Sequence, residues 1–184
     1  MDLFEQMAAR DHEQVIAFQN NATGLRGFLA IHDTTLGPAL GGVRLWPYAS
    51  DAEALADALR LSRAMTYKAS LAGLPCGGGK AVIVLHAGLK REPAFEAFGR
   101  MVDSLRGRFF TGRDVGITDD DLAAIARATP YVACESSPRS ATSANTPPRA
   151  CGTACARAWS SPASPGLAWR CRASAAWGCG WRGS

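Results

Sequence analysis

The sequence predicts an α/β fold in which a mixed sheet is flanked by helices over residues 11–133, followed by a tail of low order. Short apolar runs typical of strands alternate with longer segments of helical periodicity. No stretch reaches the roughly 18 consecutive apolar residues of a membrane span, so we expect no membrane contact. The composition changes abruptly at residue 134, and this change divides the chain into two segments, 1–133 and 134–184.

The first predicted element is a β-hairpin. Residues 13–19 and 25–32 are strand-like apolar runs, and the turn signal N-A-T-G at 21–24 separates them. A loop over residues 37–42, rich in glycine and containing a proline, then leads to a short strand at residues 43–46. These elements supply three strands of the predicted sheet.

A capped helix and a buried strand are predicted next, over residues 50–66 and 80–85. Ser50 and Glu53 form the pattern of a capping box. Residues at helical spacing follow: Leu55, Ala58, Leu59, Ser62 and Met65. Residues 80–85 (KAVIVL) are a continuous apolar run after the lysine, typical of a buried strand. Between the two elements, a turn is predicted at Gly77, Gly78 and Gly79, where the backbone can approach a ligand closely.

The remaining predicted elements complete the sheet and its second helical layer. A helix over residues 92–105 would place one apolar stripe in the core: Phe95, Phe98, Met101, Val102 and Leu105. A strand at 108–112, a helix capped by Thr118 and Asp121, and a strand at 131–133 follow. Asp114 falls in the loop at the end of a strand, where α/β folds place catalytic groups, although loop aspartates more often form turns.

Lys68 and Lys80 frame the glycine run and are the candidate chemical groups. A phosphate-binding loop is excluded, because Leu74 and Ala81 stand where that motif needs glycine and a serine or threonine. Two solvated lysines at the ends of elements are the alternative interpretation. Lys80, however, opens an apolar strand beside a second positive charge, where a partly desolvated ammonium loses its proton more easily and can act as a base.

The three histidines, His12, His32 and His86, are interpreted as structural or solvated. No carboxylate or cysteine recurs beside them at ligand spacing, so we expect no metal site. The N-terminus (MDLFEQMAARDHEQ) is acidic and amphipathic and does not resemble a secretory signal, and a cytoplasmic location is therefore expected.

Residues 134–184 have a composition unlike that of a folded domain. They hold five of the six cysteines and four of the five tryptophans, but no Ile, Val, Phe, Met, Tyr, Asp, His or Lys. Six arginines and one glutamate give this segment a charge of +5, so the basic character of the chain resides there. A nucleic-acid arm, a zinc module and a disulfide knot are disfavoured, since there is no C-x-x-C pair, lysine or histidine.

A reading-frame change is the hypothesis that accounts for this segment. If each codon starts one base earlier, residues 168–182 admit an apolar run followed by G-x-G-x-x-G, the start of a dinucleotide-binding unit. Only the last of these glycines is forced, through the single codon of Trp177. As written, the chain has no in-frame dinucleotide site, and with few aliphatic residues the segment is expected to be poorly ordered.

Four segments resemble the Glu/Leu/Phe/Val amino acid dehydrogenases in order and spacing: LGPALGGVRLWPYAS (36–50), ALRLSRAMTYK (58–68), AGLPCGGGKAVIV (72–84) and TGRDVG (111–116). The similarity covers roughly residues 11–133, the family's N-terminal substrate and dimerisation domain, and is greatest to leucine dehydrogenases. The resemblance implies that Lys68 holds the substrate carboxylate, that Lys80 is the general base acting through water, and that Asp114 handles protons at the amine.

The resemblance also implies an NAD-dependent oxidative deamination of an apolar L-amino acid by a homo-oligomer. It places Leu40, Gly41, Met65 and Gly112 at the substrate, with Leu40 and Gly112 against its side chain. An apolar pocket disfavours glutamate as a substrate. A leucine enzyme would carry alanine at position 112, and the smaller Gly112 leaves room for a larger side chain, so phenylalanine remains a possible substrate. Arg113 is expected to point to solvent. The order predicted is leucine and its branched relatives first, phenylalanine second and glutamate last. A non-catalytic amino-acid-binding or oligomerisation fragment is the alternative.

Overall fold

A computed structural model describes residues 2–133, and the predictions made for residues 134–184 lie outside the described residues. The chain divides into two compact units after Val132. The elements of the first unit are α1 (Leu3–Ala8), β1 (Gln14–Asn20), β2 (Leu25–Asp33), β3 (Ala39–Trp46), α2 (Asp51–Leu71), β4 (Gly77–Val84), α3 (Arg91–Ser104), β5 (Phe109–Arg113) and α4 (Asp119–Ala128). The mixed α/β sheet predicted from the sequence is confirmed.

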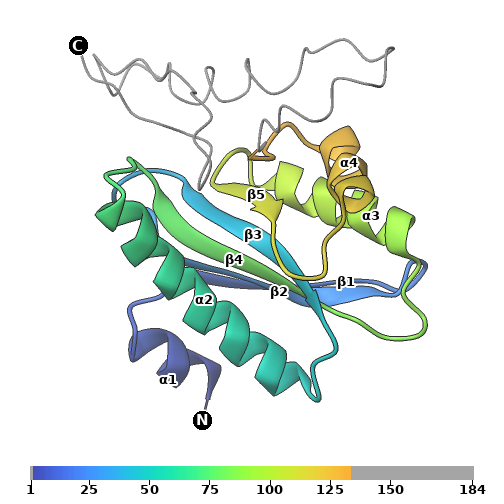
Figure 1. The fold of residues 1–184 in the computed structure, drawn as a ribbon. Coiled ribbons are helices and arrows are strands. Elements are labelled where there is room, and N and C mark those ends of the chain that lie inside the picture. The colour runs from blue at the N-terminus through green and yellow to red at the C-terminus, as the bar shows by residue number, and fades with distance from the viewer. Residues whose placement is uncertain (1, 134–184) are drawn as a thin grey trace. The chain divides into compact units, whose positions relative to one another are not determined.

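The five strands form one sheet in the order β1-β2-β4-β3-β5. The predicted hairpin is present, with β1 antiparallel to β2, and β2 is also antiparallel to β4. β3 lies parallel to both β4 and β5. Figure 1 shows α2 running along one face of the sheet, mainly over β4 and β2, while α3 and α4 pack together on the other face. Because side chains alternate along a strand, each central strand supplies both layers.

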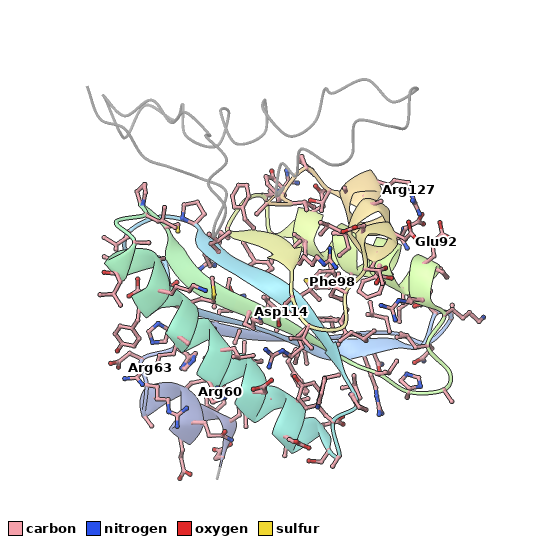
Figure 2. The ribbon with its side chains drawn as sticks, in the orientation of Figure 1. Arg60, Arg63, Glu92, Phe98, Asp114 and Arg127 are labelled. Carbon is pink, nitrogen blue, oxygen red and sulfur yellow. The ribbon has the colours of Figure 1, made fainter. Side chains whose placement is uncertain are left out.

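The core on the α3 and α4 face is the larger one. Phe95 and Phe98 of α3 and Phe109 of β5 are fully buried there among aliphatic residues of the strands. α2 instead buries small residues, Ala54, Ala58 and Ser62, which allow it to lie close to β2 and β4. Figure 2 shows Phe98 on the α3 side and Arg60 on α2.

Several predicted boundaries were wrong. β3 begins at Ala39, so most of the predicted loop at 37–42 is strand, and α2 continues to Leu71 instead of ending near residue 66. α1 was not predicted, and the strand expected at 131–133 is a single bridge between Val132 and Thr111. At the start of α2, the Ser50 side chain accepts from the Glu53 backbone as predicted, while the Glu53 carboxylate accepts from the Ala49 backbone.

Candidate active site

Lys80 is the charged residue at the centre of the candidate site. It lies on β4 and shares the α2 face with Val82, two residues further along the strand. Only 6% of its side chain is exposed, and its Nζ lies 2.9 Å from Oδ2 of Asp114. A buried ammonium without a counter-ion would be costly, and Asp114 supplies the counter-ion. The structure therefore brings together the two residues predicted to do the chemistry.

Gly42 makes this contact possible. Asp114 follows β5, and β3 lies between β4 and β5 in the sheet. Gly42 pairs with Gly112 on β5 and, by the β3–β4 register, is level with Lys80. A Cβ atom at this position would lie 3.0 Å from Cβ of Asp114 and 2.8 Å from the carbonyl oxygen of Arg113. The absence of a side chain on the intervening strand leaves the space in which Lys80 reaches Asp114.

Arg44 is the second cation beside Asp114. It lies two residues after Gly42, on the same face of β3, and its Nε donates to the same Oδ2 at 2.8 Å. Its Nη1 donates to Oδ2 of Asp57, on α2, at 3.0 Å. Asp57 also accepts from the Tyr48 hydroxyl at 2.7 Å and from Arg60 at 2.7 Å. A continuous chain of contacts thus joins Lys80, through Asp114 and Arg44, to α2.

This environment shifts the pKa values of both central groups. Burial lowers the pKa of Lys80, and the nearby Arg44 guanidinium lowers it further, while the contact with Asp114 opposes both effects. Burial alone would raise the pKa of Asp114, but the contacts with Lys80 and Arg44 outweigh it and hold that pKa below the usual range. The pair thus combines an amine that gives up its proton more readily than a free lysine and a carboxylate that stays ionised.

Two of the predicted substrate residues, Leu40 and Gly112, lie on the same side of the sheet as this pair. Leu40, Gly42 and Arg44 alternate along β3, and Leu40 is level with Gly78 of β4 and with Phe110 of β5. Leu40 and Gly112 are both partly exposed, as a wall of an open site requires. Arg113, the next residue along β5, is exposed and its Nη1 lies 2.6 Å from Asp119, as predicted for a residue that points away from the pocket.

Met65 and Lys68 are placed by α2. Met65 is partly exposed and lies in the turn of α2 that crosses Gly78, while Lys68 is exposed in the last turn of the helix. Gly41 is buried, and a Cβ on it would overlap the carbonyl oxygen of Gly79. Gly41 thus packs against the backbone of β4. Lys68 is exposed on α2, whereas Lys80 is buried on β4.

The predicted glycine turn is corrected by the structure, since Gly77, Gly78 and Gly79 are the first three residues of β4. None of them has a positive φ, so the backbone conformation does not require glycine at these positions. Glycine is needed there because a side chain would have no room. A Cβ on Gly78 would overlap backbone and side-chain atoms of Thr66 on α2, and one on Gly79 would lie 2.8 Å from the Phe109 ring. Close packing of a helix and an aromatic ring against the strand explains the glycines.

The residues that the structure describes do not fit a dinucleotide. The only run of three glycines among them continues as a strand, whereas a pyrophosphate cradle needs a turn from a strand into a helix N-terminus. Within residues 2–133, no group of three or more His, Cys, Asp or Glu side chains is arranged to hold a metal ion. A redox cofactor is therefore not assigned to any residue of this unit.

The histidines have structural partners. His12 Nε2 lies 2.9 Å from the Leu59 carbonyl oxygen, and His86 Nε2 lies 2.7 Å from that of Gly24. His32 is held between the Arg10 carbonyl oxygen and the Thr66 hydroxyl. Their interpretation as structural residues is confirmed. In the described part of the chain, no helix is both long and apolar enough to cross a lipid bilayer.

Comparison with known proteins decides the family. The family model described as "Glu/Leu/Phe/Val dehydrogenase, dimerisation domain" matches residues 12–131. The chain belongs to this family. Among curated relatives, an L-tryptophan dehydrogenase of Nostoc punctiforme is 52% identical over 132 residues, which cover 72% of this chain and 37% of the relative. Leucine dehydrogenase of Geobacillus stearothermophilus is 53% identical over 133 residues (72% and 36%). Phenylalanine dehydrogenase of Bacillus thermotolerans is 54% identical over 121 residues (65% and 31%).

Two solved structures of the family share the fold. The crystal structure of the Nostoc punctiforme L-tryptophan dehydrogenase has a TM-score of 0.69 at 51% identity, covering 71% of this chain and 39% of that one. A hetero-hexameric glutamate dehydrogenase from Thermus thermophilus has a TM-score of 0.56 at 25% identity, covering 66% and 33%. The match of this chain thus spans little more than a third of the length of its relatives.

Gly42, Arg44 and Asp57 lie in the candidate site and were not predicted from the sequence. The signal for the first two was the alternation L-x-G-x-R along residues 40–44, which places all three side-chain positions on one face of a strand. That signal is lost if residues 37–42 are taken as a loop. Asp57 lies on α2, and nothing in its local sequence distinguishes it from a solvated helix residue.

Proposed function

We propose that this unit is the substrate half of an enzyme that oxidatively deaminates an apolar L-amino acid, with NAD as the hydride acceptor and a 2-oxo acid and ammonia as products. The observation that carries the proposal is the contact of the buried Lys80 with the partly buried Asp114, 2.9 Å apart, beside the partly exposed Leu40 and Gly112. Membership of a dehydrogenase family supports it. NAD would have to be held by a part of the enzyme other than residues 2–133.

The geometry supports a division of roles between the two central groups. A neutral Lys80 can take a proton from the water that attacks the α-carbon, and its lowered pKa favours the neutral form. Asp114, ionised and within hydrogen-bond distance of Lys80, can move protons at the substrate nitrogen. We assign the substrate carboxylate to Lys68, because a charge-assisted contact from an exposed lysine at the end of α2 would orient the amino acid.

The substrate side chain would lie against Leu40 and Gly112. This pocket offers no cation to a glutamate side chain, so apolar amino acids are favoured. Relatives named for leucine, phenylalanine and tryptophan match this chain at 52 to 54% identity, so overall identity does not choose among them. We retain leucine and its branched relatives first, phenylalanine second and glutamate last, and we propose a homo-oligomer on the basis of the dimerisation-domain match.

The test is catalysis by a chimera in which residues 1–133 are joined to the C-terminal part of the Geobacillus stearothermophilus leucine dehydrogenase. We expect NAD-dependent oxidation, with kcat/KM greater for leucine than for phenylalanine or tryptophan, and least for glutamate. A folded, oligomeric chimera that oxidises none of these amino acids would overturn the proposal. If phenylalanine or tryptophan were preferred, Gly112 rather than Leu40 would set the size of the pocket. Gly112→Ala should then shift the preference in kcat/KM back to leucine.

The alternative function is non-catalytic amino-acid binding or oligomerisation by the 184-residue chain itself. The chimera distinguishes it: leucine binding, measured by calorimetry, in a folded chimera that oxidises none of the amino acids supports it, whereas NAD-dependent turnover refutes it.

A further inference from the structure

Arg44 is a charged residue of the candidate site to which the sequence patterns assign no role. Its side chain is 21% exposed, and it contacts two carboxylates that belong to different elements. Nε is bonded to Asp114 after β5, and Nη1 is bonded to Asp57 of α2. A guanidinium presents its donors in a rigid fork, so contacts through two of its nitrogens fix its orientation.

Asp114 has no comparable support of its own. It lies just beyond the end of β5, in a segment that turns toward Gly116, which has a positive φ of 80°. Among the contacts within residues 2–133, both side-chain donors to Asp114 use the same oxygen, Oδ2. Asp114 is therefore held through one oxygen by two cations, Lys80 from β4 and Arg44 from β3.

We propose that Arg44 is a positioning residue that holds the Asp114 carboxylate against Lys80, and that Asp57 on α2 holds Arg44 in turn. The proposal rests on the proposed function for its catalytic consequence, but not for its structural content. Tyr48 and Arg60 complete the support, because both donate to Asp57 at 2.7 Å. The position of Asp114 is thereby tied to α2, the same helix that carries Met65 and Lys68.

A direct role of Arg44 in binding the substrate carboxylate is the competing interpretation. The geometry argues against it, since two of the three guanidinium nitrogens already contact carboxylates of the protein. A substrate carboxylate would have to displace Asp114 or Asp57 to gain a bidentate contact. The two interpretations differ in kinetics: a positioning residue changes mainly kcat, whereas a carboxylate ligand changes mainly KM.

The decisive experiment uses the 184-residue chain and needs no activity. The chain has only three lysines, Lys68, Lys80 and Lys90, so lysine labelled with ¹³C at Cε gives three assignable NMR signals. The charged groups that act on Lys80 are Asp114 beyond β5, Arg44 on β3 and Asp57 on α2. In Arg44→Met, two effects on the pKa of Lys80 oppose each other: loss of the neighbouring positive charge raises it, whereas displacement of the Asp114 carboxylate lowers it. Arg44→Lys keeps the positive charge and loses the fork, so it isolates the effect of displacing Asp114.

Controls separate positioning from a general loss of structure. Arg127→Met is the matched control, because Arg127 on α4 also contacts two carboxylates, Glu92 and Glu96, on the other side of the sheet (Figure 2). It should leave the Lys80 titration unchanged. The Lys90 signal, from an exposed residue bonded to the Ala22 carbonyl oxygen, reports whether each variant is folded. Because Arg44→Lys keeps the charge but cannot reproduce the fork, its Lys80 titration should lie at lower pH than that of the parent chain.

The outcomes are decisive in both directions. A Lys80 titration that is unchanged or moves to higher pH in a folded Arg44→Lys chain overturns the inference. In the chimera, Arg44→Met and Arg44→Lys should both lower kcat by roughly 10- to 100-fold, as expected for a misplaced catalytic group, with KM nearly unchanged. A raised KM with unchanged kcat would also overturn the inference, in favour of carboxylate binding. If the parent chimera is inactive while the Lys80 titration shifts as expected, the proposed function fails and the positioning role of Arg44 stands.

Discussion

The two faces of the central sheet use the same strands for different purposes. On the α3 and α4 face, alternate residues of the strands meet Phe95, Phe98 and other buried apolar groups. On the α2 face, the alternate positions of β3 and β4 carry glycines, Arg44 and Lys80 beside a smaller apolar cluster that includes Leu59 of α2 and Val82 and Val84 of β4. One face provides the packing that stabilises the fold, and the other leaves room for charged groups to meet.

The difference shows how a buried charge is accommodated. Burial of Lys80 is a cost to folding unless its counter-ion is close and well placed. The larger apolar core on the opposite face can supply the free energy that offsets this cost. Substitutions on the two faces should therefore separate activity from stability, and the following experiments test that separation.

The largest effect is expected for Lys80→Ala in the chimera. Loss of a general base should lower kcat by about 10²- to 10⁴-fold. The thermal midpoint should change little by comparison, because the variant also removes a buried charge from the fold. Steady-state kinetics and circular dichroism check this. A kcat within a factor of a few of the parent would show that the chemistry does not depend on this face.

Phe98→Ala tests the opposite face. A buried phenylalanine replaced by alanine should lower the free energy of unfolding by about 3–5 kcal/mol. Urea unfolding of the 184-residue chain measures this, and the Lys80 titration of the folded variant should remain as in the parent. Phe4→Ala is the matched control, because Phe4 is 74% exposed and its loss should cost little. An equal cost for the two substitutions would contradict the assignment of the core to the α3 face.

Lys68→Ala tests whether Lys68, on α2, binds the substrate carboxylate. Removal of one charge-assisted contact, worth about 1.5–3 kcal/mol, should raise KM for leucine roughly 10- to 100-fold with a much smaller change in kcat. Lys90→Ala, which removes an exposed lysine remote from the site, serves as the control. If KM is unaffected in Lys68→Ala, the substrate carboxylate is held by another residue.

The smallest effect is expected for the carboxylate of Asp121, on α4. Burial alone would raise the pKa of Asp121, but hydrogen bonds from Arg91 and from the Thr118 backbone and hydroxyl outweigh it and lower the pKa. A lowered folded-state pKa contributes stability that is fully present above the unfolded value of about 3.9 and is lost as pH falls through the folded value. Thermal midpoints measured below pH 4 should therefore fall less steeply in Asp121→Asn than in the parent. Asp120→Asn, at an exposed neighbour, should retain the parent slope.

Much of the fold follows from local sequence patterns. The hairpin at 13–32, the stripe on α3 and the caps of α2 and α4 each depend on side-chain period or on one capping residue, both of which act over a few neighbours. Lys80 and Asp114 were also predicted, because a motif resemblance and their places at element ends pointed to them. Their direct contact across β3 could not be predicted, since it depends on the sheet order β4-β3-β5.

The sequence by itself predicted most of the elements, the family resemblance and the two central groups of the candidate site, Lys80 and Asp114. The tertiary structure alone decided that Gly77, Gly78 and Gly79 are strand residues selected for space, because the atoms that would collide with a side chain come from Asp33, Thr66 and Phe109. It also decided that Arg44 contacts both Asp114 and Asp57. Arg44 is 70 positions from Asp114 and 13 positions from Asp57 in the sequence. The three charged groups meet only because the strand order and the placement of α2 bring them together.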